Sequence, residues 1–226
     1  MAAGQKPLIY SYTFLQCYDD ICPHQAYHRY ILKDVPFVKT PEMEWGNQVH
    51  SAFEYRVGGG KPLPAAMQQW EPFAAAFDGK NAKTEMQIGL SSKATIVDYF
   101  KGQDIKYRCK IDLHIVSDNK AALFDYKTGG SKYEKPLELE IQAMFLKAKY
   151  PQLKQIAGHY IWLKENRIGQ KYDLSSVRAT WDWCEQTVAK IEADLKRGEF
   201  EKRRGGLCKG YCPVEDCEHW QPKQER

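Results

Sequence analysis

Residues 105–127 have the sequence IKYRCKIDLHIVSDNKAALFDYK, and this stretch predicts two neighbouring β-strands. β-Branched, aromatic and other apolar residues dominate Ile105–Val116 and Ala121–Lys127. The segment between them, Ser117–Lys120, is short and polar, which is typical of a tight turn. We therefore expect an antiparallel strand pair at the centre of the chain.

Three charged residues of this strand pair are expected to converge. Residues two apart on a strand share a face, so Asp125 and Lys127 point to one side, and the short turn brings Asp112 near it. Two nearby carboxylates suit Mg²⁺ or Mn²⁺, which can activate water and polarise a phosphodiester. A neighbouring ammonium can stabilise charge on the phosphate. The same spacing also suits a solvated ion pair between Asp125 and Lys127.

Helical segments flank the strands. The sequence predicts an extended Leu8–Thr13, helices at Tyr18–Leu32, Pro41–Val57, Ala65–Phe77, Leu137–Tyr150 and Ser176–Arg197, and further strands at Thr84–Leu90, Thr95–Phe100 and Gln155–Leu163, with Ile168–Leu174 as a hairpin partner. This order predicts an α/β fold with a central mixed β-sheet flanked by helices.

Two helical residues extend the candidate site. Gly46, His50 and Glu54 are spaced by four, so they lie along one side of their helix. His50 could then supply an imidazole ligand to the same metal ion. Gln142, on a later helix, could orient the substrate or the lysine. Taken alone, a helical histidine is more often a solvated or core residue, and Gln142 is a surface glutamine.

The bulk composition describes an ordinary globular protein. The 226 residues suffice for one sizeable domain, or one with a small appendage, and the net charge of +4 permits a nucleic-acid partner without requiring one. No apolar run approaches the roughly 18 residues of a membrane span. Residues 1–7 lack the apolar core of a signal peptide. We therefore expect a cytoplasmic protein with no membrane partner.

The cysteines indicate a metal or cluster site in the tail. In a reducing compartment, seven cysteines predict metal ligands or buried thiols rather than disulfides. Cys208, Cys212 and Cys217 follow a C-x3-C-x4-C spacing in a Gly-rich segment. A fourth ligand is needed, and His219 would complete a local tetrahedral zinc site.

Taken together, these motifs resemble the PD-(D/E)XK nuclease superfamily in its RecB-like branch, from Ser11 to about Tyr150 and again in the cysteine tail. The resemblance rests on the ordered set Ser11-Tyr12-Thr13, Cys22-Pro23, Gly46 with His50, Asp112, Asp125 with Lys127, and Gln142. It implies a restriction-endonuclease-like core over residues 1–200, including an N-terminal helical part. The cysteine-rich segment 201–226 would pack with the N-terminal Cys-Pro region.

The resemblance also implies roles for the site residues. The metal ligands would be His50, Asp112, Asp125 and the backbone carbonyl of Tyr126. The catalytic residues would be Asp112, Asp125, Lys127 and Gln142. The expected aromatic residue four positions after Gln142 is replaced by Leu146.

For the cysteines, the resemblance implies a [4Fe–4S] cluster that joins the two ends of the chain. Its ligands would be Cys22, Cys208, Cys212 and Cys217, with Cys17 as the second choice for the N-terminal position. Zinc is the alternative.

The function implied is a Mg²⁺- or Mn²⁺-dependent DNA exonuclease. It resembles the CRISPR-associated iron–sulfur exonucleases and their phage relatives, which act on single-stranded ends in recombination, repair or CRISPR adaptation. A recombination or CRISPR adaptation protein would be a partner, and the location would be the host cytoplasm if the chain is phage-encoded. The alternative is a non-catalytic DNA-binding module stapled by a cluster or zinc. An electron-transfer role would leave His50 and the Asp-x-Lys pair unexplained.

Overall fold

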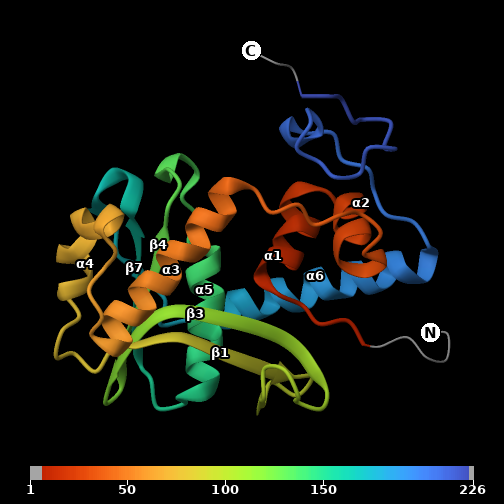
Figure 1. Ribbon diagram of the computed structural model, residues 1–226. Helices are drawn as coiled ribbons and strands as arrows, with labels where there is room; N and C mark the ends of the chain where they lie inside the picture. The colour runs from red at the N-terminus through yellow and green to blue at the C-terminus, as the bar shows by residue number, and fades with distance from the viewer. Residues whose placement is uncertain (1–6, 224–226) are drawn as a thin grey trace. The chain divides into compact units, whose positions relative to one another are not determined.

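The structure, a computed structural model, describes residues 7–223 and divides into two compact units (Figure 1). One unit holds the described residues of Met1–Val38 and Trp181–Arg226, coloured red and blue in Figure 1. The other holds Lys39–Thr180, coloured orange to teal. Among the described residues, no helix has both the length and the apolar character needed to cross a bilayer.

The larger unit is built on one mixed sheet of seven strands. The strand order is β2-β1-β3-β4-β5-β6, with β7 also paired to β5. Only β4 and β5 are parallel, and the other pairs are antiparallel. The strands are β1 Lys83–Ser91, β2 Ile96–Val97, β3 Ile105–Ser117, β4 Lys120–Lys127, β5 Gln155–Trp162, β6 Arg167–Ile168 and β7 Tyr172–Asp173. The expected α/β fold with a central mixed sheet is confirmed.

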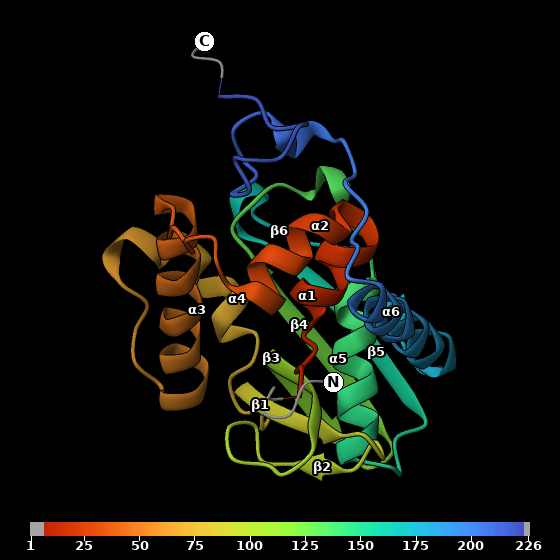
Figure 2. The same cartoon turned by 90° about the vertical axis from the view of Figure 1, so that its right-hand side faces the viewer.

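Two helices cover opposite faces of this sheet (Figure 2). Helix α3 (Pro41–Gly59) buries Val49 and Phe53 against one face, where Leu113 of β3 and Tyr126 of β4 complete the core. The short helices η3 (Ala65–Trp70) and α4 (Glu71–Ala75) extend the same layer. The remaining helices of the unit are η4 Ser131–Tyr133, α5 Leu137–Lys149 and η5 Leu163–Glu165. Helix α5 packs on the other face, where alternation along β4 also places Asp125 and Lys127.

Capping residues fix where the two main helices of this unit begin and end. The Thr40 hydroxyl accepts a hydrogen bond from the Met43 N–H at 3.3 Å, which satisfies one of the free donors of the first turn of α3. Gly60 stops α3 in the left-handed conformation, with φ of 68°. Helix α5 starts directly after Pro136 and ends two residues before Pro151. These stops set which residues α5 presents to the sheet.

Three segments of the larger unit differ from the sequence prediction. The expected strand Thr95–Phe100 shrinks to β2, because the Asp98 carboxylate accepts hydrogen bonds from two backbone N–H groups of the following turn, at 2.9 and 2.6 Å. The expected helix Ala65–Phe77 divides into η3 and α4, with Pro72 in the first turn of the second helix. The expected hairpin partner Ile168–Leu174 divides into β6 and β7.

The smaller unit is helical with an irregular tail. Its elements are α1 Tyr12–Gln16, the π-helix η1 Cys17–Ile21, α2 Pro23–Ala26, the π-helix η2 Tyr27–Leu32, most of α6 Arg178–Arg197, and η6 Gly206–Cys208. The prediction of an extended backbone up to Thr13 was wrong at its end. Helix α1 already begins at Tyr12, because the Ser11 hydroxyl accepts a hydrogen bond from the Phe14 N–H at 3.3 Å.

Side-chain hydrogen bonds connect α6 to the N-terminal helices inside this unit. The Tyr18 hydroxyl donates to Asp194 at 2.5 Å, and the Trp183 indole donates to Asp19 at 2.9 Å. The tail returns to the same region, where the His24 N–H donates to the Glu201 carbonyl at 3.0 Å. Segments far apart in sequence therefore form one unit.

Candidate metal centre and cysteine cavity

The centre of the sheet opens beside Asp112. Strands β3 and β4 pair next to their turn, and the last pair of this ladder is Leu113 with Phe124. Beyond it β3 stays bonded to β1, while β4 stays bonded to β5. The Tyr126 N–H, which lies past the end of the ladder, donates instead to Asp112 Oδ2 at 3.2 Å. The Asp112 carboxylate therefore occupies the point where the two strands separate.

His50 and Glu85 complete a group of three potential metal ligands around Asp112. His50 Nδ1 on α3 lies 3.2 Å from Asp112 Oδ2 and 3.9 Å from Glu85 Oε1 on β1. One ligand atom from each of the three residues lies within 4.8 Å of the others. Glu85 also forms an ion pair with Lys110. An imidazole and two carboxylates are suitable ligands for a divalent cation such as Mn²⁺ or Mg²⁺.

Glu85 also has an unusual backbone. Its φ is 53°, a left-handed conformation that non-glycine residues rarely adopt inside a strand. Such a conformation costs on the order of 1–3 kcal/mol, and residues that keep it outside turns cluster at functional sites. Thr84 pairs with Leu113 and Met86 pairs with Ile111, so Glu85 lies across from Asp112. This strained backbone has no signature in the sequence, so spacing and periodicity do not identify Glu85 as a ligand.

A second group of residues surrounds Asp125 on the α5 side of the sheet. Lys127 Nζ lies 2.6 Å from Asp125 Oδ2 and 2.7 Å from Glu138 Oε2. Gln142 donates a hydrogen bond from Nε2 to Asp125 Oδ1 at 2.9 Å. The Tyr160 ring lies beneath the ammonium, with its centroid 5.4 Å from Nζ. Glu138 and Gln142 are one turn apart on α5, so the helix presents both to the end of β4.

Burial and charge act in opposite directions on these groups. Burial raises the pKa of Asp125, and the Lys127 ammonium opposes that rise. For Lys127, burial would lower the pKa, but the carboxylates of Asp125 and Glu138 raise it well above its ordinary value. Burial would likewise lower the pKa of His50, and the hydrogen bond and charge of Asp112 raise it instead. Lys127 therefore keeps its proton, and a cation would compete with protons for Asp125 and His50.

The chemistry of the donor set fits a hard divalent cation. Beyond the His50–Glu85–Asp112 group, Gln142 Oε1 is buried and accepts no hydrogen bond from the described residues. A buried acceptor left unbonded costs on the order of 1–3 kcal/mol, so this atom is placed to accept a bond from a ligand or substrate. The arrangement can hold a cation and place an ammonium beside it.

The sequence-predicted site residues of this unit fall into two groups. Among the described residues, Asp125 is not in the group of three potential ligands that holds His50 and Asp112. His50 touches Asp112, the main chain of Tyr126 bonds Asp112, and Asp125 touches Lys127 and Gln142. The sequence interpretation missed Glu138. Its position one turn before Gln142 was a usable signal, because i and i+4 residues of a helix share a face.

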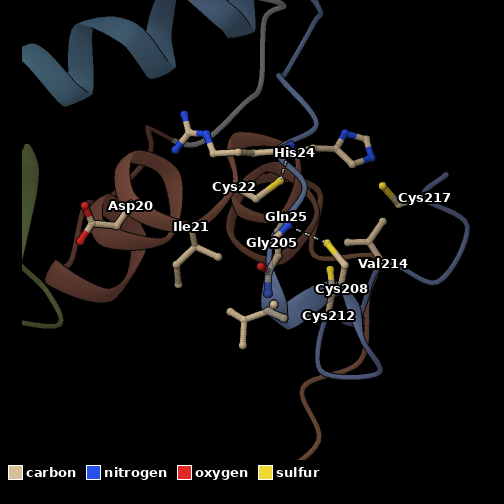
Figure 3. Close-up of a pocket in the computed structure, with 13 residues that line it drawn as sticks. Asp20, Ile21, Cys22, His24, Gln25, Gly205, Cys208, Cys212, Val214 and Cys217 are labelled. Carbon is tan, nitrogen blue, oxygen red and sulfur yellow. Dashed lines mark hydrogen bonds between the residues drawn. The ribbon is translucent and has the colours of Figure 1, made fainter. Parts of the chain in front are cut away.

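The predicted cysteine ligands line one cavity of the smaller unit (Figure 3). Its volume is about 180 Å³, and its walls include Cys22, Cys208, Cys212 and Cys217. Two sulfur atoms accept backbone hydrogen bonds, Cys22 from the Arg203 N–H at 3.3 Å and Cys208 from the Gly205 N–H at 3.4 Å. Burial raises the pKa of Cys212, and the neighbouring thiols add to the rise.

The described cysteine sulfur atoms are not gathered as closely as the ligands of a single ion. In the described part of the chain, no three cysteine or histidine ligand atoms come within 4.8 Å of one another outside the His50 group. Tetrahedral zinc with Zn–S bonds of about 2.3 Å would hold its sulfur ligands roughly 4 Å apart. His219, the expected fourth zinc ligand, is not among the described residues that line the cavity. Cys17 does not line it either, and burial raises its pKa to about 12.

Comparisons with known proteins give a likeness of fold. No protein-family model matches the chain, and no curated protein matches its sequence. The crystal structure of a candidate exonuclease from Eubacterium rectale superposes with a TM-score of 0.53 at 12% identity, covering 96% of this chain and 89% of that chain. The protein SSO0001 gives a TM-score of 0.46 at 16% identity, covering 95% of this chain and 87% of the other. At this identity, the likeness to the Eubacterium rectale structure is one of fold.

Proposed function

We propose that this protein is a metal-dependent nuclease that hydrolyses phosphodiester bonds in DNA. The observation that carries the proposal is the position of His50 and Asp112 at the separation of β3 and β4, with Asp125 and Lys127 at the end of the adjoining strand. Two carboxylates, an imidazole and an ammonium from three elements are the groups that metal-assisted phosphodiester hydrolysis needs.

Each residue has a distinct role in this proposal. His50, Asp112 and Asp125 would hold Mg²⁺ or Mn²⁺ with the carbonyl of Tyr126, and Glu85 is placed to join them. The bound ion would supply Lewis acidity to the phosphate and lower the pKa of a water molecule. Lys127 stabilises the negative charge that develops on the phosphate. Gln142 fixes Asp125 through Nε2 and leaves Oε1 free to orient the substrate.

For the substrate, we propose single-stranded DNA with free ends. Two things support this choice: the motifs resemble RecB-like exonucleases, and the Eubacterium rectale protein of similar fold is described as a candidate exonuclease. Attack in line with the leaving 3′-oxygen would produce 5′-phosphate ends.

The test is degradation of labelled DNA in the presence of Mn²⁺. We expect the wild-type protein to shorten linear single-stranded DNA and to leave closed circular DNA intact. Cleavage should stop when EDTA is added. Lys127→Ala should lose at least about 100-fold of the rate, because it removes charge stabilisation at the phosphate. Lys120→Ala is the matched control, since Lys120 lies on the same strand at the far end. Binding of DNA without cleavage by wild type would instead support a non-catalytic DNA-binding module.

For the cysteine cavity, we propose a [4Fe–4S] cluster held by Cys22, Cys208, Cys212 and Cys217. A cluster binds each sulfur to a different iron atom, so its ligands lie farther apart than those of one ion, which suits sulfur atoms spread around a cavity. Backbone N–H bonds to two of the sulfurs are a further feature of such sites.

Metal analysis of protein purified without oxygen separates the two cofactors. We expect about four iron atoms per chain and absorption near 400 nm. About one zinc per chain and no colour would overturn the cluster, without bearing on the nuclease assay.

A further inference from the structure

Lys127 lies between two carboxylates, and only one of them belongs to the proposed metal site. Its Nζ is 2.6 Å from Asp125 Oδ2 and 2.7 Å from Glu138 Oε2. Gln142 holds the other oxygen of Asp125 at 2.9 Å. The oxygen of Asp125 that faces the ammonium is thus the one that Gln142 leaves available for a cation.

This geometry creates a competition. Asp125 is 2% exposed, so its carboxylate cannot turn to bulk water, whereas the Lys127 side chain is 28% exposed and can do so only in part. Leaving the half-buried Lys127 ammonium without an anionic partner costs free energy, and this cost would oppose any use of Asp125 as a metal ligand. Glu138 removes that obstacle, because its carboxylate is already in contact with the ammonium.

We propose that Glu138 is a positioning residue that retains the Lys127 ammonium while Asp125 turns to the divalent cation. The inference rests on the proposed function for the role of the metal site. It assigns Glu138 no contact with substrate or metal. The Tyr160 ring contacts the Lys127 ammonium from another side. Glu138 and Tyr160 therefore fix the position of the ammonium when Asp125 turns to the cation.

Helix α5 offers a matched pair of variants. Glu138→Gln keeps the side-chain size and removes the charge at the ammonium. Glu140→Gln makes the same chemical change two residues away on the same helix, and two residues apart on a helix do not share a face. Circular dichroism and the melting temperature report whether each variant folds. Glu138→Asp provides a second test that keeps the charge.

The readout is Mn²⁺ affinity, measured by electron paramagnetic resonance of free Mn²⁺ in the absence of DNA. Glu138→Gln leaves Asp125 as the only anionic partner of the ammonium, so the dissociation constant for Mn²⁺ should rise about fivefold. Glu140→Gln should stay within about twofold of wild type, and Glu138→Asp should lie between.

A double-mutant cycle distinguishes two explanations for weaker Mn²⁺ binding in Glu138→Gln. One is loss of the carboxylate that retains the Lys127 ammonium, and the other is a general loss of negative charge near the site. In a Lys127→Ala background there is no ammonium to retain, so adding Glu138→Gln should leave Mn²⁺ affinity unchanged. An equal loss of affinity with and without Lys127 would overturn the proposal, as would wild-type affinity in Glu138→Gln. Because the measurement needs no cleavage, failure of the nuclease assay would leave this result standing.

Discussion

The candidate metal centre and the cysteine cavity differ in what holds their residues in place. Asp112 and Asp125 lie on neighbouring central strands, are 8% and 2% exposed, and accept hydrogen bonds from groups of the unit's own core. The cysteines of the cavity are half-buried and lie mostly in irregular tail segments, where η6 is only three residues long. One site is fixed by strand register, and the other by short loops.

This difference indicates what stabilises each site. A site built on strands and helices is preorganised, so it can bind and release a catalytic ion without rearranging. A site built on loops gains its order from what it binds, and the binding free energy then becomes folding free energy. We therefore expect damage at the metal centre to change activity, and damage at the cavity to change stability.

The strongest test of this difference between the two sites is the variant Asp112→Asn. The amide oxygen can still accept the hydrogen bond from the Tyr126 N–H, so the opening between β3 and β4 should persist. The lost charge should lower DNA cleavage by at least about 100-fold, since the ligand for the cation is weakened. A melting temperature within about 2 °C of wild type is expected for a change that preserves the hydrogen bond. A large fall in melting temperature would show that Asp112 is structural.

Cys212→Ser should give the opposite result. Loss of one cluster ligand should remove the iron and lower the melting temperature by at least about 5 °C, because the tail loses the group that orders it. Mn²⁺ affinity, a property of the other unit, should stay within about twofold. The control is Cys109→Ser, a thiol on β3 that should keep its iron. If Cys212→Ser retained its iron, Cys212 would not be a cluster ligand.

The sequence predicted several neighbours within the candidate metal centre, because their positions follow from strand periodicity. Alternation along β4 places Asp125 and Lys127 on one face, and a short turn brings Asp112 to the neighbouring strand. The helical spacing of His50 was also sufficient to place it on one side of α3. Each of these arguments needs only local spacing and an antiparallel register.

The remaining features depend on contacts that spacing does not encode. The positive φ of Glu85 and the end of the β3–β4 ladder at Leu113 arise from packing of the whole sheet. The strand Thr95–Phe100 was overpredicted because its apolar residues suit a strand, whereas the Asp98 side chain forms a turn there. Local propensity was overridden by a side-chain hydrogen bond.

His114 gives a smaller, pH-dependent effect in the larger unit. It is 1% exposed, and neither ring nitrogen bonds to a described residue. Burial, followed by the charges of Lys83 and Lys149, lowers its pKa to about 4. The unfolded chain therefore binds the proton more tightly, and the free energy of unfolding should fall as pH drops from about 6.5 to about 4, by about 3 kcal/mol.

Urea unfolding at pH 7 and pH 4 checks this effect. His114→Leu cannot take up the proton, so its stability should fall by about 3 kcal/mol less than that of wild type over the same interval. If the free energy of unfolding fell equally in the two proteins, the acid sensitivity would arise from groups other than His114, for example in the tail.

The smallest effect is expected at Gly158 of β5, where α5 approaches the sheet. A Cβ at this position would collide with Leu174 Cδ1 and would lie 3.4 Å from Leu139 Cδ1. Gly158→Ala should therefore cost about 2 kcal/mol, whereas Gly129→Ala, with no atom within 4 Å of the added carbon, should be nearly neutral. Because Leu139 adjoins Glu138 on α5, a shift of this helix should also weaken Mn²⁺ binding in Gly158→Ala. If Gly158→Ala lost stability but kept its Mn²⁺ affinity, Mn²⁺ binding would not depend on the position of α5 on the sheet.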